Sequence, residues 1–97
     1  MATTETWTKD PQARLDYVFD WSDWVPDGDS IISYEVLVTP QTDIDQLVVD
    51  ESALLADQVV VWMTAGKLKS NYSITCRVTT SGGRIDDRTR VMRIVNK

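Results

Sequence analysis

The segment LKSNYSITCRVTT, residues 68–80, decides the fold. From Tyr72 to Thr79, apolar and polar side chains alternate without a break. A period of two is typical of a half-buried β-strand, because successive side chains point to opposite faces of the sheet. We therefore predict a strand over Tyr72–Thr80, with Cys76 as a small residue of the core.

The residues after this strand predict a hairpin. Ser81–Gly83 contains two glycines, and glycine readily adopts the positive φ that tight hairpin turns need. The chain should then return as a last strand over Arg84–Val95. We expect Met92 and Ile94 to face the core, because the charged Arg93 lies on the opposite parity.

Toward the N-terminus, four more segments have the composition of strands. Leu15–Trp21 alternates between apolar and acidic residues, and Ile31–Val38 is rich in β-branched and apolar residues. Leu47–Val49 is a short apolar run, and Val59–Thr64 is a longer one. Such runs, bounded by glycine, proline or aspartate, are typical of strands. The acidic stretch Asp50–Asp57 is predicted to be a loop or a single helical turn.

The length and the pattern together limit the fold class. With 97 residues, 42% of them hydrophobic, the chain can form one domain around one core. Short strands and frequent turns, with no helical period, indicate an all-β protein. We predict an immunoglobulin-like or fibronectin type III-like β-sandwich of about seven strands. Residues 11–97 would form the sandwich, and the polar residues 1–10 an N-terminal arm that ends at Pro11.

A structural motif opens the Tyr72–Thr80 strand. Leu68 and Tyr72 have the spacing of the tyrosine corner, and the segment resembles that corner in immunoglobulin-like and fibronectin type III domains. The resemblance implies that Leu68 caps the core and that the Tyr72 hydroxyl bonds to backbone near the start of the strand. Cys76 is the single cysteine and cannot form an intramolecular disulfide, so a disulfide-free subtype is implied.

The chemistry open to this chain is narrow. It contains no histidine, which removes the commonest general base and most zinc and iron sites. We therefore expect no enzyme activity, no catalytic residue, no metal and no cofactor. We also expect no signal peptide in the polar residues 1–12. No membrane span is expected, because the apolar stretch Val59–Met63 is far shorter than the roughly 20 residues that a spanning helix needs.

Charge is divided unevenly along the chain. Residues 1–58 hold 13 acidic and 2 basic residues, whereas residues 59–97 hold 2 acidic and 8 basic residues. Two opposite patches favour contacts with proteins, or with copies of the same chain, over binding of a nucleic acid. The alternative is that the acidic residues simply crowd solvated loops.

Two groups of acidic residues allow more than one interpretation. Asp23, Asp27 and Asp29 surround a glycine turn, and Asp43 and Asp45 form a second pair. Oxygen ligands with such spacing can hold calcium at the end of a sandwich, and paired carboxylates can serve a sugar hydrolase. We favour the simpler interpretation that aspartate stabilises the turns themselves.

Four tryptophans are many for a chain of this length. Trp21 and Trp62 fall within strand patterns and are predicted to lie in the core. Trp7 and Trp24 fall outside the alternation, which makes each a candidate for exposure. An exposed tryptophan could stack on sugar rings, as in a carbohydrate-binding module, but anchoring a protein interface is the favoured use.

The last predicted strand is rich in charge. Arg84, Arg88 and Arg90 share a parity, and Asp86 and Asp87 are interleaved with them. Charge on an edge strand prevents unwanted pairing with other strands. The functional alternative is a polar interface with an acidic neighbour, such as the acidic loops of another copy.

Several short motifs follow one another in a definite order along most of the chain. They are Lys9-Asp10-Pro11, Leu15-Asp16-Tyr17, Phe19-Asp20-Trp21-Ser22-Asp23-Trp24, Val61-Trp62, Gly66, Tyr72 with Thr75, Val78-Thr79-Thr80-Ser81, Gly83-Arg84 and Asp86-Asp87-Arg88. In order and spacing, the chain from Lys9 to about Ile94 resembles a family of small tailed-bacteriophage proteins described as fibre–tail adaptor proteins.

The resemblance implies a virion component, made in the host cytoplasm and present in several copies, as a homo-oligomer or a ring. Such a component would join the tail to fibres or to neighbouring virion proteins; a head or head–tail joining protein is the alternative. We expect neither membrane nor nucleic acid among its partners, and we expect the N-terminal end to dock. The predicted interface residues are Trp7, Lys9, Asp10, Trp24, Arg84, Arg88 and Arg90.

Overall fold

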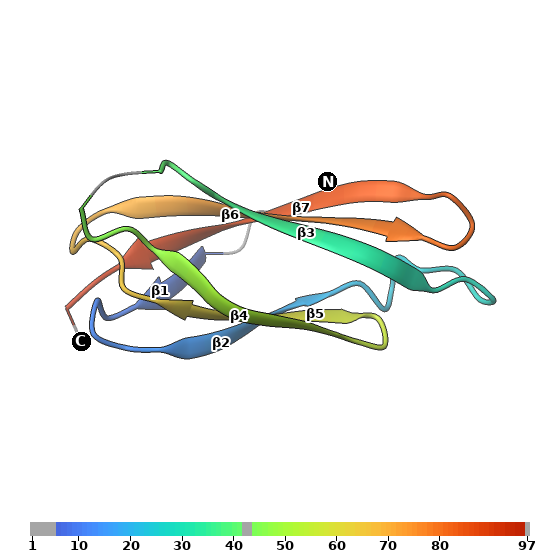
Figure 1. Ribbon diagram of the computed structural model, residues 1–97, viewed down its shortest axis with the longest axis horizontal. Coiled ribbons are helices and arrows are strands. Elements are labelled where there is room, and N and C mark those ends of the chain that lie inside the picture. The colour runs from blue at the N-terminus through green and yellow to red at the C-terminus, as the bar shows by residue number, and fades with distance from the viewer. Residues whose placement is uncertain (1–5, 42–43, 97) are drawn as a thin grey trace.

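The computed structural model describes residues 6–41 and 44–96 of the chain. This described part forms seven strands and no helix (Figure 1). The strands are β1 (Thr6–Lys9), β2 (Leu15–Asp20), β3 (Ile31–Thr39), β4 (Val48–Leu55), β5 (Gln58–Thr64), β6 (Asn71–Thr80) and β7 (Ile85–Ile94).

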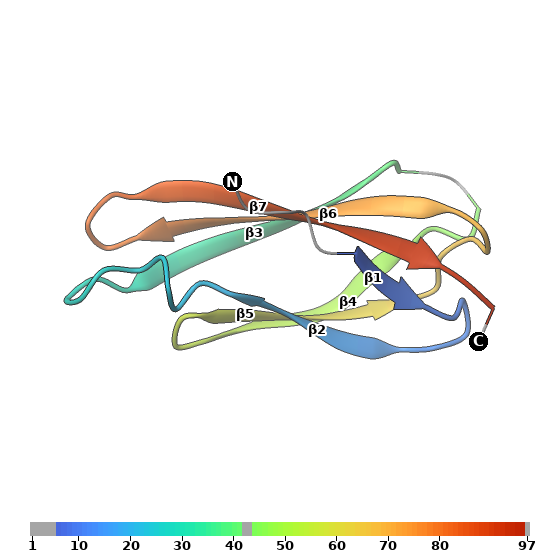
Figure 2. The same cartoon turned by 180° about the vertical axis from the view of Figure 1, so that it is seen from behind.

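The strands form two sheets that lie face to face. One sheet has the order β1-β7-β6-β3 and the other β2-β5-β4, and Figures 1 and 2 show the two layers from opposite sides. The predicted all-β sandwich is confirmed. Strands two, four and five share one sheet and strands three, six and seven the other, as in seven-stranded immunoglobulin domains. Strand β1 departs from that arrangement by pairing with β7, and the immunoglobulin-like assignment stays a prediction.

The C-terminal hairpin follows the alternation in the sequence. Strands β6 and β7 pair antiparallel on either side of the turn at Ser81–Gly83. Cys76 on β6 is fully buried, and so are Met92 and Ile94 on β7. The predicted hairpin and the predicted register of the last strand are both confirmed.

Strand β4 differs from what the sequence predicts. Most of the stretch Asp50–Asp57, predicted as a loop or a helical turn, belongs to this strand, which pairs antiparallel with β5. A β-bulge between Val49 and Glu51 interrupts the register. The bulge lets Val49 and Leu54 both pack against the core. Because it breaks the period of two, it also conceals the strand from a pattern analysis.

Strand β1 is the second difference. The sequence predicts an arm over residues 1–10, but Thr6–Lys9 runs parallel to β7, with Thr6 opposite Val91 and Lys9 opposite Ile94. Residues 1–5 of the predicted arm lie outside the described residues. Within the described chain, β7 is therefore an edge strand only over its first part, up to Arg90.

The core fills the space between the sheets. Trp21 is fully buried there, as predicted. Trp62 is only partly buried, and the prediction that it lies in the core is wrong. Its neighbours Val61 and Met63 are fully buried, so the intervening side chain points to the outer face of β5. The buried apolar residues are Phe19, Trp21, Ile31, Val38, Leu47, Val59, Val61, Met63, Tyr72, Ile74, Cys76, Val78, Met92 and Ile94.

Tyr72 ties the start of β6 to two neighbouring segments. It is only 2% exposed. Its hydroxyl accepts a hydrogen bond from the Lys67 amide at 3.0 Å and donates one to the Asp45 carbonyl at 3.3 Å. Leu68 is 42% exposed, which departs from the core-capping role that the resemblance to the tyrosine corner implies, whereas Leu47 is buried at 1% exposure.

Candidate docking surfaces

Arg88 and Arg90 point toward the space between the sheets. They share the parity of the buried Met92 on β7. The Arg88 guanidinium lies 4.3 Å from the centroid of the Trp21 ring, and that of Arg90 lies 5.6 Å from the Phe19 ring. Arg88 also donates to the Asp20 carbonyl. These two arginines cover the core on the side where β7 faces β2.

Lys9 is fully buried. Its ammonium donates to the Asp10 carbonyl at 2.6 Å and to the Ala13 carbonyl at 2.7 Å. Burial lowers the pKa of Lys9, and the nearby Asp10 partly offsets this change. In this fold the side chain holds the turn between β1 and β2 in place, so it is not exposed to a partner.

Trp7 packs back on the sandwich. Its ring stacks on Tyr17 at 4.7 Å between centroids and meets Phe19 edge-on at 5.2 Å. The Tyr17 hydroxyl donates to the Thr8 carbonyl at 2.8 Å. Burial raises the pKa of Tyr17, and Asp16 raises it further. The sequence makes Trp7 a candidate for exposure, but the side chain is partly buried and packs against the core.

The remaining predicted interface residues differ in accessibility. Trp24 is partly buried and meets Trp21 edge-on, with ring centroids 5.1 Å apart. Asp10 is partly buried, and its carboxylate accepts from the Gln12 amide at 2.8 Å. Arg84, at the tip of the β6–β7 hairpin, is exposed. Five of the seven residues thus have side chains that pack against or brace the core, namely Trp7, Lys9, Trp24, Arg88 and Arg90.

The outer face of the three-stranded sheet presents an apolar surface that the sequence analysis did not identify. We call it the Trp62 face. Leu55 is 58% exposed, Val48 is 44% exposed and Val18 is 42% exposed. They lie opposite Gln58, Thr64 and Val60 of β5, respectively, and so share the outer face with the partly buried Trp62. The face consists of Val18, Val48, Ala53, Leu55, Val60 and Trp62.

Charged residues border the Trp62 face. The Arg14 guanidinium lies 4.5 Å from the centroid of the Trp62 ring, and it pairs with the Asp50 carboxylate at 2.5 Å. Asp16 and Glu51 lie opposite Trp62 on the two neighbouring strands. An aromatic residue within an apolar surface with a charged border is a common composition for a protein interface. The signal was available in the sequence, since Trp62 lies between two core residues of a strand.

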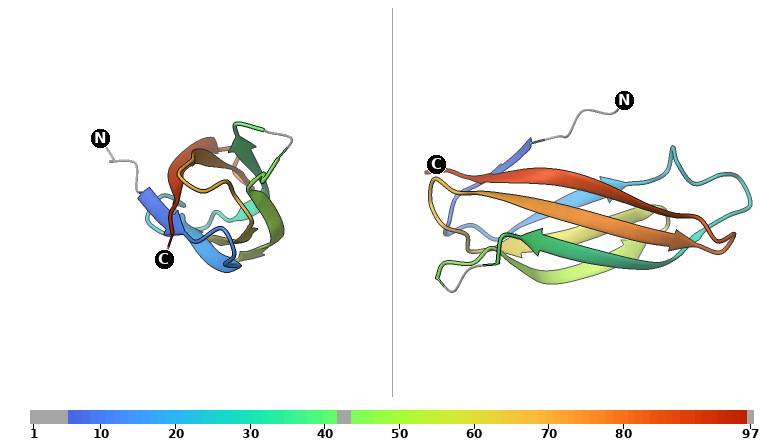
Figure 3. Two further views of the ribbon diagram at one scale, coloured as in Figure 1. Left: turned by 90° about the vertical axis from the view of Figure 1, so that its left-hand side faces the viewer. Right: turned by 90° about the horizontal axis from the view of Figure 1, so that it is seen from above.

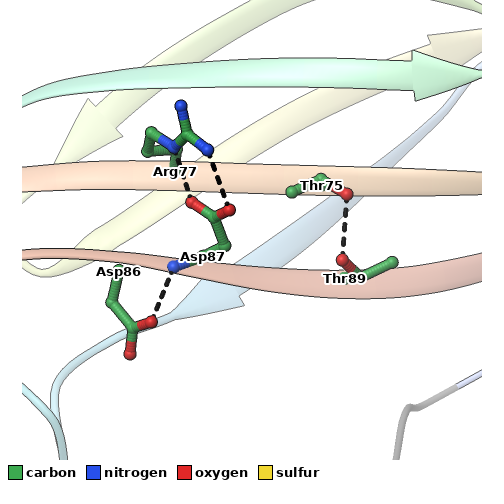
Figure 4. A network of polar contacts seen from close by, with 5 residues as sticks. All are labelled: Thr75, Arg77, Asp86, Asp87 and Thr89. Atoms are coloured by element: carbon green, nitrogen blue, oxygen red, sulfur yellow. Dashed lines mark hydrogen bonds and ion pairs between the residues drawn. The ribbon is translucent and has the colours of Figure 1, made fainter.

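The outer face of the four-stranded sheet is polar and internally paired (Figure 4). Arg77 donates to both carboxylate oxygens of Asp87, at 2.7 and 3.1 Å, and its side chain holds the pKa of Asp87 below the usual value. Thr75 and Thr89 share a hydrogen bond of 2.9 Å. The Asp86 carboxylate accepts from the Asp87 amide at 2.9 Å. The charged and hydroxyl groups at the centre of this face thus bond to one another.

Of the two groups of aspartates, Asp29 stabilises turns, and Asp43 lies outside the described residues. The Asp29 carboxylate accepts from the Ser81 hydroxyl at 2.6 Å and from the amides of Gly82 and Ser30, each at 2.9 Å. These bonds, led by that from Ser81, hold the pKa of Asp29 far below its usual value. They join the β2–β3 loop to the β6–β7 hairpin. Within residues 6–41 and 44–96, no three acidic, histidine or cysteine side chains are grouped to hold a metal ion.

The only cysteine has no accessible chemistry. Cys76 is fully buried, and burial raises the pKa of its thiol to about 11, an effect that the Trp21 side chain partly offsets. The thiol is therefore protonated at neutral pH. In the part of the chain that the structure describes, no helix is long and apolar enough to cross a membrane.

Together these features define a small single-cysteine β-sandwich whose conspicuous surfaces are an apolar sheet face and open strand edges. A family model described as podophage GP4 fiber-tail adaptor protein gp77 matches residues 9–93. The chain belongs to this family of phage fibre–tail adaptor proteins, which confirms the family resemblance. No curated protein matches the sequence.

Proposed function

We propose that this protein is a non-enzymatic joint in a phage virion, which connects the tail to a fibre. The family match over residues 9–93 carries this proposal. The chemistry of the chain agrees with it, because the sequence has no histidine and one cysteine. For such a protein, function consists of making contacts on more than one side.

The Trp62 face is the best candidate for one of these contacts. Its exposed residues Val18, Val48 and Leu55 extend across all three strands of the sheet together with Trp62. Burying this surface against a partner would remove apolar area from water, at roughly 25 cal/mol per Å². Arg14 and the acidic border would then set the orientation of the partner.

Several copies per particle are part of the proposal. The strands from Ile31 to Leu55 contain no lysine or arginine, whereas the C-terminal hairpin contains five arginines. A chain with such separated charge can pack beside copies of itself without like charges meeting. The same acidic balance over the whole chain, a net charge of −5, argues against nucleic acid as a partner.

The test is incorporation of variants into particles. In a phage that lacks its own copy of the gene, Trp62→Ala supplied in trans should reduce the amount of the protein in purified particles by about tenfold or more. Ile85→Ala, which removes an exposed apolar side chain from the other sheet, is the matched control and should be incorporated normally. Circular dichroism establishes that both variants fold.

Two results would contradict the proposal. Normal incorporation of folded Trp62→Ala would exclude the Trp62 face as the contact surface. Absence of the wild-type protein from purified particles, measured by mass spectrometry, would exclude the virion role itself. Labelling of the protein in intact particles separates a tail joint from the alternative position between head and tail.

A further inference from the structure

Strand β3 ends its sheet with a long open edge. Among the described residues it pairs only with β6, and Figure 3 shows it as the outer strand of its layer. The Ser81 amide, directly after β6, donates to the Ser30 carbonyl, directly before β3. Because the backbone groups of successive residues in a strand point to alternate sides, the odd-numbered residues of β6 point their amide and carbonyl groups at β3. With the register that follows the bulge, the backbone groups of Tyr34 and Val36 point away from β6, toward the open edge.

This edge lacks the protection that the other edge of the same sheet has. Over the first part of β7, the Asp86 carboxylate accepts the hydrogen bond of the Asp87 amide, and β1 covers the rest. Strand β3 holds nine residues, with Glu35 as its one charged side chain and no proline or lysine. A long, apolar and unprotected edge is a template for pairing with another strand.

An apolar groove runs beside this edge. It has a volume of about 500 Å³ and lies between β3 and the segment that leads into β4. Leu37 is 51% exposed and Val48 is 44% exposed at its border. A strand that pairs with β3 could insert an apolar side chain here, since alternate residues of an added strand point to opposite faces. Val36 and Val38 of β3 and Leu47 and Val49 of the facing segment supply apolar side chains to its lining.

The charge around the edge selects the kind of strand that would fit. The exposed Glu35 lies opposite Arg77 on β6, and the Arg77 guanidinium is itself paired with Asp87. Along the sequence from Ile31 to Leu55 there are five acidic residues and no lysine or arginine, so pairing with β3 of a second copy would bring like charges together. Complementary charge favours a partner that carries lysine or arginine on the face opposite Glu35.

We propose that β3 accepts an extended, basic segment of another virion protein, which adds a strand to the four-stranded sheet. The proposal rests on the adaptor role and names the chemistry of one of its partners. Backbone hydrogen bonds with Tyr34 and Val36 would provide attachment. The groove and Glu35 would provide selectivity, through one apolar and one basic side chain of the partner.

Hydrogen exchange tests the pairing directly. In the free protein the amides of Tyr34 and Val36 should exchange rapidly, because they point to solvent. In purified particles the β3 peptide should exchange at least about tenfold more slowly at these positions. The exposed turn at Asp27–Gly28 is the internal comparison and should exchange at the same rate in both states.

Variants add a second measurement. Val36→Pro removes a backbone donor that β6 does not use, so the sheet should survive while the added strand is lost. Glu35→Lys reverses the charge at the edge, and Asp27→Lys makes the same charge change in the exposed β2–β3 loop as its control. Val36→Pro and Glu35→Lys should each lower incorporation by about tenfold, and Asp27→Lys should not. If Val36→Pro fails to fold, Glu35→Lys and the exchange data still test whether β3 pairs with an added strand.

A photo-crosslinking residue in place of the exposed Leu37 identifies what lies at the edge in particles. Capture of a peptide from another virion protein that contains lysine or arginine supports the proposal. Capture of a peptide from this same chain overturns it, and so does unchanged exchange of β3 in particles that contain the protein. Absence of the protein from particles overturns the adaptor role instead, so the two failures can be distinguished.

Discussion

The hydroxyl of Tyr72 bonds to the Lys67 amide in the β5–β6 connection and to the Asp45 carbonyl in the β3–β4 connection. Tyr72→Phe leaves the ring in the core and removes both bonds. We expect a loss of about 1–2 kcal/mol in the free energy of unfolding, because groups that are partly buried lose their partner. Urea denaturation measures it.

Tyr34→Phe is the matched control for this substitution. The Tyr34 hydroxyl bonds only to the Ser52 hydroxyl in an exposed position, where water replaces the partner. Its loss should cost less than about 0.5 kcal/mol. Equal effects of the two substitutions would mean that the Tyr72 hydroxyl has no special structural role.

Asp29 gives the protein a predictable response to acid. Its pKa is held far below the usual value by hydrogen bonds, first of all from Ser81. A carboxyl whose pKa is lower in the folded state contributes stability that is complete above its unfolded pKa and is lost as pH falls toward its folded pKa. Wild-type protein should therefore lose stability as pH falls below about 4.

Asp29→Asn should make this acid response shallower, while lowering stability at neutral pH. Asp27→Asn is the control, since its carboxylate accepts none of the three bonds that Asp29 accepts. Urea titrations at a series of pH values measure both slopes. A wild-type slope in the Asp29→Asn variant would refute the assignment.

At the scale of single residues, the sequence predicts burial well where the alternation is regular. Cys76, Met92 and Ile94 follow it and are fully buried. Lys9 does not, because no pattern indicates that an ammonium will be buried against two carbonyl groups. The positions of Arg88 and Arg90 are equally hard to predict, because their contacts with Trp21 and Phe19 depend on tertiary packing.

At the scale of elements, β1 provides the clearest test of the difference between an arm and a strand. Trp7 on β1 contacts Tyr17 and Phe19 of the other sheet. Trp7→Ala should therefore lower the free energy of unfolding by about 2–3 kcal/mol, somewhat less than truncation of a fully buried aromatic residue. A side chain in a detached arm would have no such effect.

Trp62→Ala is the control for Trp7→Ala. It removes a ring of the same size from an outer face, where the loss should be about 1 kcal/mol, mainly from the contact with Arg14. Thermal and urea unfolding of both variants would show the ranking. If Trp7→Ala proves as stable as the wild type, β1 makes no contribution to the sandwich.

The predictability of each strand depends on how it is paired. The β6–β7 hairpin can be predicted from the sequence because the side chains that face the core recur at every second residue. Strand β4 is concealed by its bulge and by the exposed acidic residues of its middle. Strand β1 has only four residues, and it pairs in parallel with residues more than eighty positions away. The local sequence does not reveal such a distant pairing.

At the scale of the whole molecule, the two open sides of the sandwich differ. On the side of β7 and β2, cationic side chains cover the aromatic core, and Lys9 secures the short strand β1. On the side of β3 and β4, an apolar groove lies beside an unprotected edge. A joint between two larger parts needs at least two receptive surfaces, and the β3 edge and the Trp62 face are the two candidates away from the closed side.

Arg88 tests whether the first side is closed by its arginines. Its guanidinium lies over the Trp21 ring and is bonded to the Asp20 carbonyl, and its side chain is 26% exposed. Arg88→Ala should cost about 1–2 kcal/mol and should make tryptophan fluorescence more accessible to quenching by acrylamide. Arg84→Ala, at the exposed hairpin tip, should change neither. If Arg88→Ala leaves both stability and quenching unchanged, Arg88 does not shield the core between β7 and β2. Strand β1 would then be the element that closes this side of the sandwich.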